Sequence, residues 1–223
     1  MMHYAHTEFE KYDDIANSEF SADEYNDISP KAVLSRSFEH VNRDAANEML
    51  VGSTTAMLVV LRDDELRIAN VGDCGVMVIR GYEPIFRNEE QQHSFNFPFQ
   101  LGTMSKDSPE DAQSYTVKVR EGDIVILATD GLFDNVFDEE IVEIINLNTN
   151  TTHPEQSNPQ AITDALLLRA KEVSEDSRSP ASPFQHRAVE QGFYYQGGKV
   201  DDVTVLAGVV RFVCLSPFVW TFI

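Results

Sequence analysis

Aspartates beside glycines mark three places in this sequence where metal chemistry could occur. They are Gly72-Asp73, Asp130-Gly131, and the run Gly197-Gly198-Lys199-Val200-Asp201-Asp202. Asp130 follows the apolar run Ile124 to Ala128, which is typical of a buried strand, so its carboxylate is expected at the edge of a sheet. Carboxylates gathered from separate strands suit a hard cation such as Mg²⁺ or Mn²⁺. An Asp-Gly pair is also common in simple turns, and the residues alone leave both interpretations open.

Other reaction chemistries find little support in the sequence. His93 has no His or Cys partner at a zinc-binding spacing, and there is no GxSxG elbow, phosphate-binding P-loop or dinucleotide fingerprint. The cysteines, Cys74 and Cys214, form neither a disulfide framework nor a CxxC metal site. We therefore expect two reduced thiols.

The elements that must position the aspartates follow from periodicity and turn residues. Ser29 and Pro30 indicate the start of a helix, which we expect at about 30–48. Further helices are expected to begin at Asp138 and at Pro159, the latter with Ile162, Leu166, Ala170 and Val173 as its buried stripe. Residues 81–114 and 174–186 are expected to be loops. Strands are expected at 54–61, 66–70, 76–79, 115–119, 124–128 and 203–210.

Length and charge limit the class of protein. A chain of 223 residues is long enough for one substantial domain, and a formal net charge of −20 argues against binding to nucleic acid or to anionic lipid. No apolar run reaches the length of a membrane span. The acidic N-terminus resembles neither a secretory signal nor an Arg-rich transit peptide. Nothing in the sequence indicates an oligomeric state.

Four motifs occur in a fixed order along the chain, namely Gly52-Ser53-Thr54-Thr55-Ala56, Ala69-Asn70-Val71-Gly72-Asp73, Leu127-Ala128-Thr129-Asp130-Gly131-Leu132-Phe133-Asp134 and Gly198-Lys199-Val200-Asp201-Asp202-Val203-Thr204. Together they make the chain resemble a known family, the type 2C, metal-dependent protein phosphatases. The resemblance runs from about residue 29 to 210, and the loop from Glu90 to Leu101 is similar to the mitochondrial branch of that family.

The resemblance implies an α+β fold, namely a four-layer α/β/β/α sandwich, and a site for two Mg²⁺ or Mn²⁺ ions. It implies that Asp130 and Asp201 are the catalytic metal ligands, and that Asp73 and Asp134 belong to a further, weaker metal site. Asp202 would support them. The implied reaction is hydrolysis of phosphoserine and phosphothreonine in proteins by a metal-activated water, so no nucleophilic cysteine is needed.

Smaller expectations follow from the same resemblance. Cys74 is expected to pack in the core, and Gly52 to Thr55 to begin a strand. The implied location is mitochondrial, with the cytoplasm as the alternative because no targeting segment is visible. The chain is expected to divide into an acidic arm or loop at 1–28, a phosphatase-like domain at 29–211 and an apolar tail at 212–223.

One family motif, Asp-Gly-x-Gly-Gly, does not occur in this sequence. In the family its aspartate bridges both metals, on an N-terminal strand. On this basis we expect a truncated N-terminal side, an exposed sheet edge, weak metal binding, and slow or no hydrolysis by this polypeptide alone. The alternative function is then a catalytically inactive or fragmentary relative that serves as a binding or regulatory module.

Overall fold

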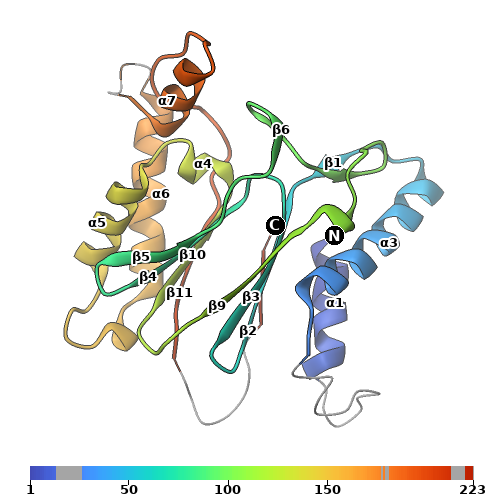
Figure 1. The fold of residues 1–223 in the computed structure, drawn as a ribbon, viewed down its shortest axis with the longest axis horizontal. Helices are drawn as coiled ribbons and strands as arrows, with labels where there is room; N and C mark the ends of the chain where they lie inside the picture. The colour runs from blue at the N-terminus through green and yellow to red at the C-terminus, as the bar shows by residue number, and fades with distance from the viewer. Residues whose placement is uncertain (14–26, 177, 179–180, 212–218, 223) are drawn as a thin grey trace.

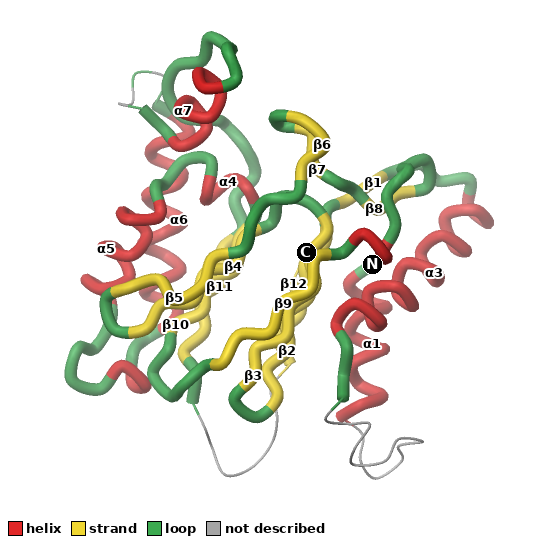
Figure 2. Tube along the Cα trace, viewed as in Figure 1, coloured by secondary structure: helices red, strands yellow, loops and turns green. Residues whose placement is uncertain are grey.

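The chain folds into four layers, with helices outside two facing sheets (Figure 1). A computed structural model describes residues 1–13, 27–176, 178, 181–211 and 219–222. Within them, one four-stranded sheet has the order β11-β10-β4-β5 and the other the order β12-β2-β3-β9. Figure 2 shows α5 and α6 outside the first sheet and α1 and α3 outside the second. The predicted α+β sandwich is therefore confirmed.

The described elements have the following bounds. The helices are α1 (Met2–Asp13), α3 (Pro30–Glu48), α4 (Asp130–Phe133), α5 (Asp138–Asn148), α6 (Pro159–Glu175) and α7 (Pro183–Glu190), with 3-10 turns η1 (Pro109–Asp111) and η2 (Pro154–Gln156). The longer strands are β2 (Ala56–Arg62), β3 (Glu65–Val71), β4 (Gly75–Arg80), β5 (Glu83–Arg87), β9 (Gln113–Lys118), β10 (Ile124–Ala128) and β11 (Val205–Val209). The short strands are β1 (Ser53–Thr54), β6 (Gln92–Ser94), β7 (Phe97–Pro98), β8 (Leu101–Gly102) and β12 (Val219–Phe222).

Strand β10, inside the first sheet, is apolar on both faces because both faces are covered. In β10, Ile124 and Ile126 pack toward the outer helices, whereas Val125 and Leu127 pack between the two sheets. The alternation follows from the two-residue period of a strand. Continuous apolar runs in the sequence therefore mark the strands at the centre of the sandwich.

Two helices begin as their sequences predict. The Ser29 hydroxyl accepts a hydrogen bond from the Ala32 amide at 3.3 Å, and α3 covers Pro30–Glu48, as expected. Asn158 caps α6 in the same way by accepting from the Gln160 amide at 3.1 Å. The predicted stripe of α6 is confirmed, since its four residues are buried.

Two segments predicted as loops contain regular structure. Glu83–Arg87 forms β5, an edge strand paired with β4, where Pro84 is tolerated because an edge strand needs fewer backbone donors. Pro183–Glu190 forms α7, which Ser182 begins by accepting a hydrogen bond from the Gln185 amide at 3.1 Å. Ser182 and Pro183 could begin a helix, as Ser29 and Pro30 do, but a segment rich in serine and proline is also typical of a loop.

The prediction of an irregular arm at 1–28 was wrong for Met2–Asp13, which form helix α1. Ala5 and Phe9, four residues apart, are buried against α3 and the second sheet. Glu8 is also buried, and its carboxylate accepts hydrogen bonds from Lys11 of the same helix at 2.5 Å and from Arg36 of α3 at 2.7 Å. Arg36 lies 28 residues away, so the sequence did not reveal it as a partner. Residues 14–26 of the predicted arm lie outside the described residues.

Replacing Phe9 by Ala tests whether α1 belongs to the folded core. Because the ring is fully buried, we expect the free energy of unfolding to fall by about 3 kcal/mol. Urea denaturation measures the change, and Glu10→Ala, on the exposed face of the same helix, is the control, expected within about 0.5 kcal/mol of wild type. Equal stability of the two variants would show that α1 unfolds independently of the core.

The expected exposed edge beside β2 is covered by another strand. Val219–Phe222 form β12, which pairs antiparallel with β2 from Met57 to Val60, so that β2 has a neighbour on each side. Most of the predicted apolar tail, residues 212–218 and 223, lies outside the described residues. The division of the chain at residues 28 and 211 stays a prediction.

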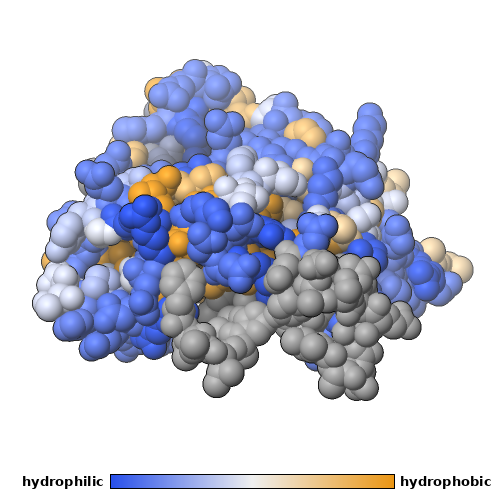
Figure 3. Space-filling view, turned by 60° about the horizontal axis from the view of Figure 1, so that its bottom comes forward, coloured by the Kyte–Doolittle hydropathy of each residue, from blue (hydrophilic) through white to orange (hydrophobic). Residues whose placement is uncertain are grey.

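Polar residues dominate the face of the molecule shown in Figure 3, where apolar residues form only small patches among the described ones. This agrees with the burial of most large aliphatic side chains in the three layers of core. Among the described helices, none combines the length and the apolar character that a membrane crossing requires.

Candidate metal centre

Two of the predicted ligands lie at the same end of the first sheet. Asp130 follows β10 as the first residue of α4, and Asp201 precedes β11, the antiparallel neighbour of β10. In an antiparallel pair, the end of one strand lies beside the start of the other. Residues 71 positions apart in sequence are thereby brought together.

Asp134 completes a group of three carboxylates. One oxygen from each of Asp130, Asp134 and Asp201 lies within 4.8 Å of the others. Asp134 follows α4, and its amide donates to the carbonyl of Asp130 at 2.7 Å, so one helical turn sets their spacing. An all-oxygen, anionic set of this kind fits Mg²⁺ or Mn²⁺ better than a softer metal.

Backbone contacts hold the two chain segments close together. The Thr129 amide donates to the Thr204 carbonyl, and the Thr204 amide donates to the Thr129 hydroxyl, both at 3.1 Å. The buried Asn135 side chain donates to the carbonyls of Gly131 and Lys199 and accepts from the Lys199 amide, each at 2.9 Å. These bonds fix the main chain on both sides of the carboxylates.

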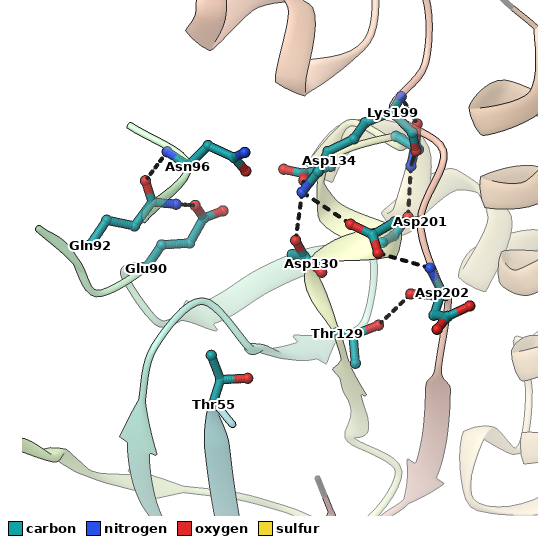
Figure 4. A network of polar contacts seen from close by, with 12 residues as sticks. Thr55, Glu90, Gln92, Asn96, Thr129, Asp130, Asp134, Lys199, Asp201 and Asp202 are labelled. Atoms are coloured by element: carbon teal, nitrogen blue, oxygen red, sulfur yellow. Dashed lines mark hydrogen bonds and ion pairs between the residues drawn. The ribbon is translucent and has the colours of Figure 1, made fainter. Parts of the chain in front are cut away.

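Lys199 lies among the three carboxylates (Figure 4). Its ammonium is 2.7 Å from Asp130 Oδ2, 2.6 Å from Asp134 Oδ2 and 3.1 Å from Asp201 Oδ2. Burial alone would lower the pKa of this lysine, but Asp134 and Asp130 outweigh burial and raise the pKa. The ammonium is therefore firmly charged and offsets part of the negative charge of the group.

The three carboxylates differ in their surroundings. The side chain of Asp134 is only 4% exposed, against 25% for Asp130 and 35% for Asp201. Burial raises the pKa of Asp134 to about 6, even though Lys199 and Arg187 favour its charged form. Arg187 of α7 donates to Asp134 and, at 2.9 Å, to Glu90 Oε1. This arginine ties α7 to the carboxylate group.

Asp73 is outside this group, although it lies near the same end of the sheet. It follows β3 and is buried. Burial raises its pKa to about 6, with a further upward contribution from the charges of Asp130 and Glu90. No close carboxylate set that includes Asp73 is found in the part of the chain that the structure describes. Its role in a further metal site stays a prediction.

Asp202 and Cys74 have different surroundings from the carboxylate group. The Asp202 side chain is exposed, and its backbone amide donates to Asp201 Oδ1 at 2.9 Å. Cys74 is buried between the sheets, as predicted, and its sulfur lies 3.4 Å from the Thr55 hydroxyl. Burial raises the pKa of the Cys74 thiol to about 11, so it is a poor nucleophile at neutral pH.

The low reactivity of Cys74 can be measured. With a pKa of about 11, only about one thiol in a thousand is ionised at pH 8. In a Cys214→Ser background, we expect Cys74 to react with a thiol reagent at least ~100-fold more slowly in the native protein than in denaturant. The rate should rise with pH up to about 11. Equal rates in the folded and unfolded chain would contradict the burial of this thiol.

Sequence reasoning missed three side chains of this site: Lys199, Asn135 and Arg187. Lys199 and Asn135 stand in or beside the motifs already described, but their types gave no reason to assign them a role. Arg187 lies one residue beyond the segment predicted to be a loop, 174–186, and nothing in the sequence assigned it a role. Only its contacts with Glu90 and Asp134 connect it to the site.

Comparison with known proteins identifies the family. The sequence model of "Stage II sporulation protein E (SpoIIE)" matches residues 15–208. The protein phosphatase PTC7 homolog of Homo sapiens is 40% identical over 173 residues, which is 72% of this chain and 55% of that protein. The crystal structure of the photosystem II phosphatase PBCP, 30% identical, superposes with a TM-score of 0.68 over 85% of this chain and 74% of that one. The chain belongs to the type 2C protein phosphatase family.

Other members of the type 2C family agree. The Danio rerio PTC7 homolog is 37% identical over 82% of this chain and 63% of its own length. Probable protein phosphatase 2C 55 of Arabidopsis thaliana is 38% identical over 71% of this chain and 33% of its own length. The chain thus covers 33% to 63% of the length of these curated relatives. The catalytic domain of PstP, solved with two manganese ions, has the same fold at 16% identity, with a TM-score of 0.53 over 94% of this chain and 80% of that one.

Proposed function

We propose that this chain is a metal-dependent protein phosphatase that hydrolyses phosphoserine and phosphothreonine. The supporting observation is the group formed by Asp130, Asp134 and Asp201, with carboxylate oxygens within 4.8 Å, in a chain of the type 2C family. Relatives that are 37% to 40% identical to the chain over their aligned parts are named as protein phosphatases.

In this proposal the three carboxylates hold Mg²⁺ or Mn²⁺, and Asp73 contributes to a further ion. A bound dication would offset the negative charge of phosphate oxygens. It would also lower the pKa of a water molecule bound to it toward neutral pH. Asp130 and Asp201, which are partly exposed, would present the cation to a phosphoprotein, while buried Asp134 anchors it from within. PstP, which has the same fold, was solved with two manganese ions, and this supports a two-ion site in the present chain.

The finer assignments rest on the family resemblance. We propose a mitochondrial location, as for the branch that the Glu90–Leu101 loop resembles, with the cytoplasm as the alternative. Microscopy of the tagged full-length gene product tests the location. The formal net charge of −20 predicts no nucleic acid among the partners of this protein.

The activity is tested with phosphopeptides and purified protein. We expect release of phosphate from phosphoserine and phosphothreonine peptides with Mn²⁺ or Mg²⁺, little release from a phosphotyrosine peptide, and none with a chelator. Titrating each cation separately determines which one the site prefers. Metal binding without any turnover, both in this chain and in the full-length gene product, would instead favour the inactive binding module.

A further inference from the structure

Lys199 contacts the same three carboxylates that would hold the proposed metal. Its ammonium contacts one oxygen of each of the three carboxylates, at 2.6 to 3.1 Å. The lysine side chain is only 16% exposed, and its Nζ lies 5.1 Å from the centroid of the Phe184 ring. Surrounding protein therefore holds the ammonium in place, unlike a mobile surface lysine.

An ammonium and a dication cannot both contact these three carboxylates at the same time. Mg²⁺ binds carboxylate oxygens at about 2.1 Å, so it would lie within a few ångströms of a lysine that keeps its three contacts. Like charges at that separation repel strongly in a partly buried site. One of the two cations must leave the carboxylates when the other occupies them.

The main chain of Lys199 is held by hydrogen bonds, whereas its flexible side chain can change rotamer once its ion pairs are broken. Asn135 bonds both the amide and the carbonyl of Lys199 at 2.9 Å. The ammonium is carried on a stem of four flexible carbons. A change of side-chain rotamer is therefore enough to remove the charge from the carboxylates, without any movement of the backbone.

We propose that Lys199 is a tethered counter-ion, which holds Asp130, Asp134 and Asp201 together in the metal-free protein and is displaced from them by the metal. Lys199 is then a positioning residue that lowers the apparent affinity for metal, because each binding event must break its three ion pairs. The inference rests on the proposed metal centre, and it concerns metal binding rather than turnover.

The first experiment compares Mn²⁺ binding by wild type and Lys199→Met in isothermal titration calorimetry. We expect the variant to bind Mn²⁺ at least about tenfold more tightly, because no ammonium has to be displaced. Its melting temperature without metal should be lower than that of wild type, and its rise on adding Mn²⁺ larger. Mn²⁺ binding equal to or weaker than that of wild type would overturn the proposal.

Two control variants separate displacement from a general charge effect. Lys171→Met removes the same charge from an exposed lysine of α6 that pairs with Glu175, and it should leave Mn²⁺ affinity unchanged. Lys199→Arg keeps a cation at the site and should not tighten binding. If Lys171→Met tightened binding as much as Lys199→Met, net charge rather than displacement would be responsible.

A second measurement uses wild-type protein and so does not depend on the folding of a variant. Lys199 is methylated reductively with and without Mn²⁺, and its modification is followed by mass spectrometry. We expect faster modification of Lys199 with Mn²⁺, because the ammonium leaves its three partners. An unchanged or slower rate in a protein that binds Mn²⁺ would overturn the proposal.

The outcomes also distinguish this inference from the proposed function. If neither wild type nor Lys199→Met binds Mn²⁺, the metal centre itself is wrong and both proposals fail. If wild type binds Mn²⁺ and Asp130→Asn does not, the metal centre stands. A failure of Lys199→Met to bind more tightly then refutes only the role of the lysine.

Discussion

Replacing Asp130 by Asn is expected to weaken Mn²⁺ binding by about 100-fold or more and to reduce phosphopeptide hydrolysis at least as much. Asn has nearly the same shape but lacks the negative charge, and its amide nitrogen is a poor ligand for a hard cation. Asp130 also contacts Lys199 at 2.7 Å, so the variant changes the charge balance of the whole group. Calorimetry measures the affinity, and phosphate release measures the rate.

The matched control is Asp164→Asn, the same change at an exposed position on α6. Its carboxylate accepts a hydrogen bond from Gln160 at 2.7 Å and has no contact with the site. We expect wild-type affinity and activity from this variant. Retention of Mn²⁺ affinity by Asp130→Asn would exclude Asp130 as a ligand, whatever the activity of the chain.

Replacing Gly131 by Ala is expected to damage both the fold and the metal centre. A Cβ at this position would lie 2.5 Å from the carbonyl oxygen of Asp202 and 3.0 Å from Val203 Cγ2. The first of these atoms belongs to the backbone and cannot move aside alone. We expect the free energy of unfolding to fall by about 2 kcal/mol, as for other overpacked sites. Urea denaturation measures this loss.

The same substitution should also weaken Mn²⁺ binding, because the close approach at Gly131 sets the spacing of Asp130 and Asp201. We expect a loss of about tenfold, measured by calorimetry at a temperature where the variant is folded. Gly52→Ala is the control, since a Cβ there meets nothing within 4 Å. Normal stability and affinity in Gly131→Ala would show that the two segments tolerate a wider separation.

Local signals in the sequence were sufficient for much of the fold. The helix at Pro30–Glu48 followed from Ser29 and Pro30, because a helix start depends on hydrogen bonds within one turn. The strand at Ile124–Ala128 followed from its apolar run, because both of its faces are buried. The order of the four motifs indicated the family, which the comparisons confirmed.

Elements that depend on distant partners were missed or misassigned. Helix α1 has a buried glutamate, Glu8, that is stabilised by Arg36 from another helix. Strand β5 is defined by its pairing with β4, since Glu83–Arg87 is short, is charged at both ends and contains a proline. In both cases the local sequence has weak propensity, and tertiary contacts determine the structure.

By itself the sequence determined which aspartates could hold a cation. Asp73, Asp130 and Asp201 lie in short glycine-containing segments that can be recognised locally, and Asp134 belongs to a motif of the family. Only the tertiary structure decided which of them meet: Asp130, Asp134 and Asp201 come together, while Asp73 stays outside the group. It also placed Lys199 among them, 65 to 69 residues from Asp134 and Asp130. Ion pairs form between whatever charges the fold brings within a few ångströms, and that selection is made by strand pairing and packing, which no local pattern encodes.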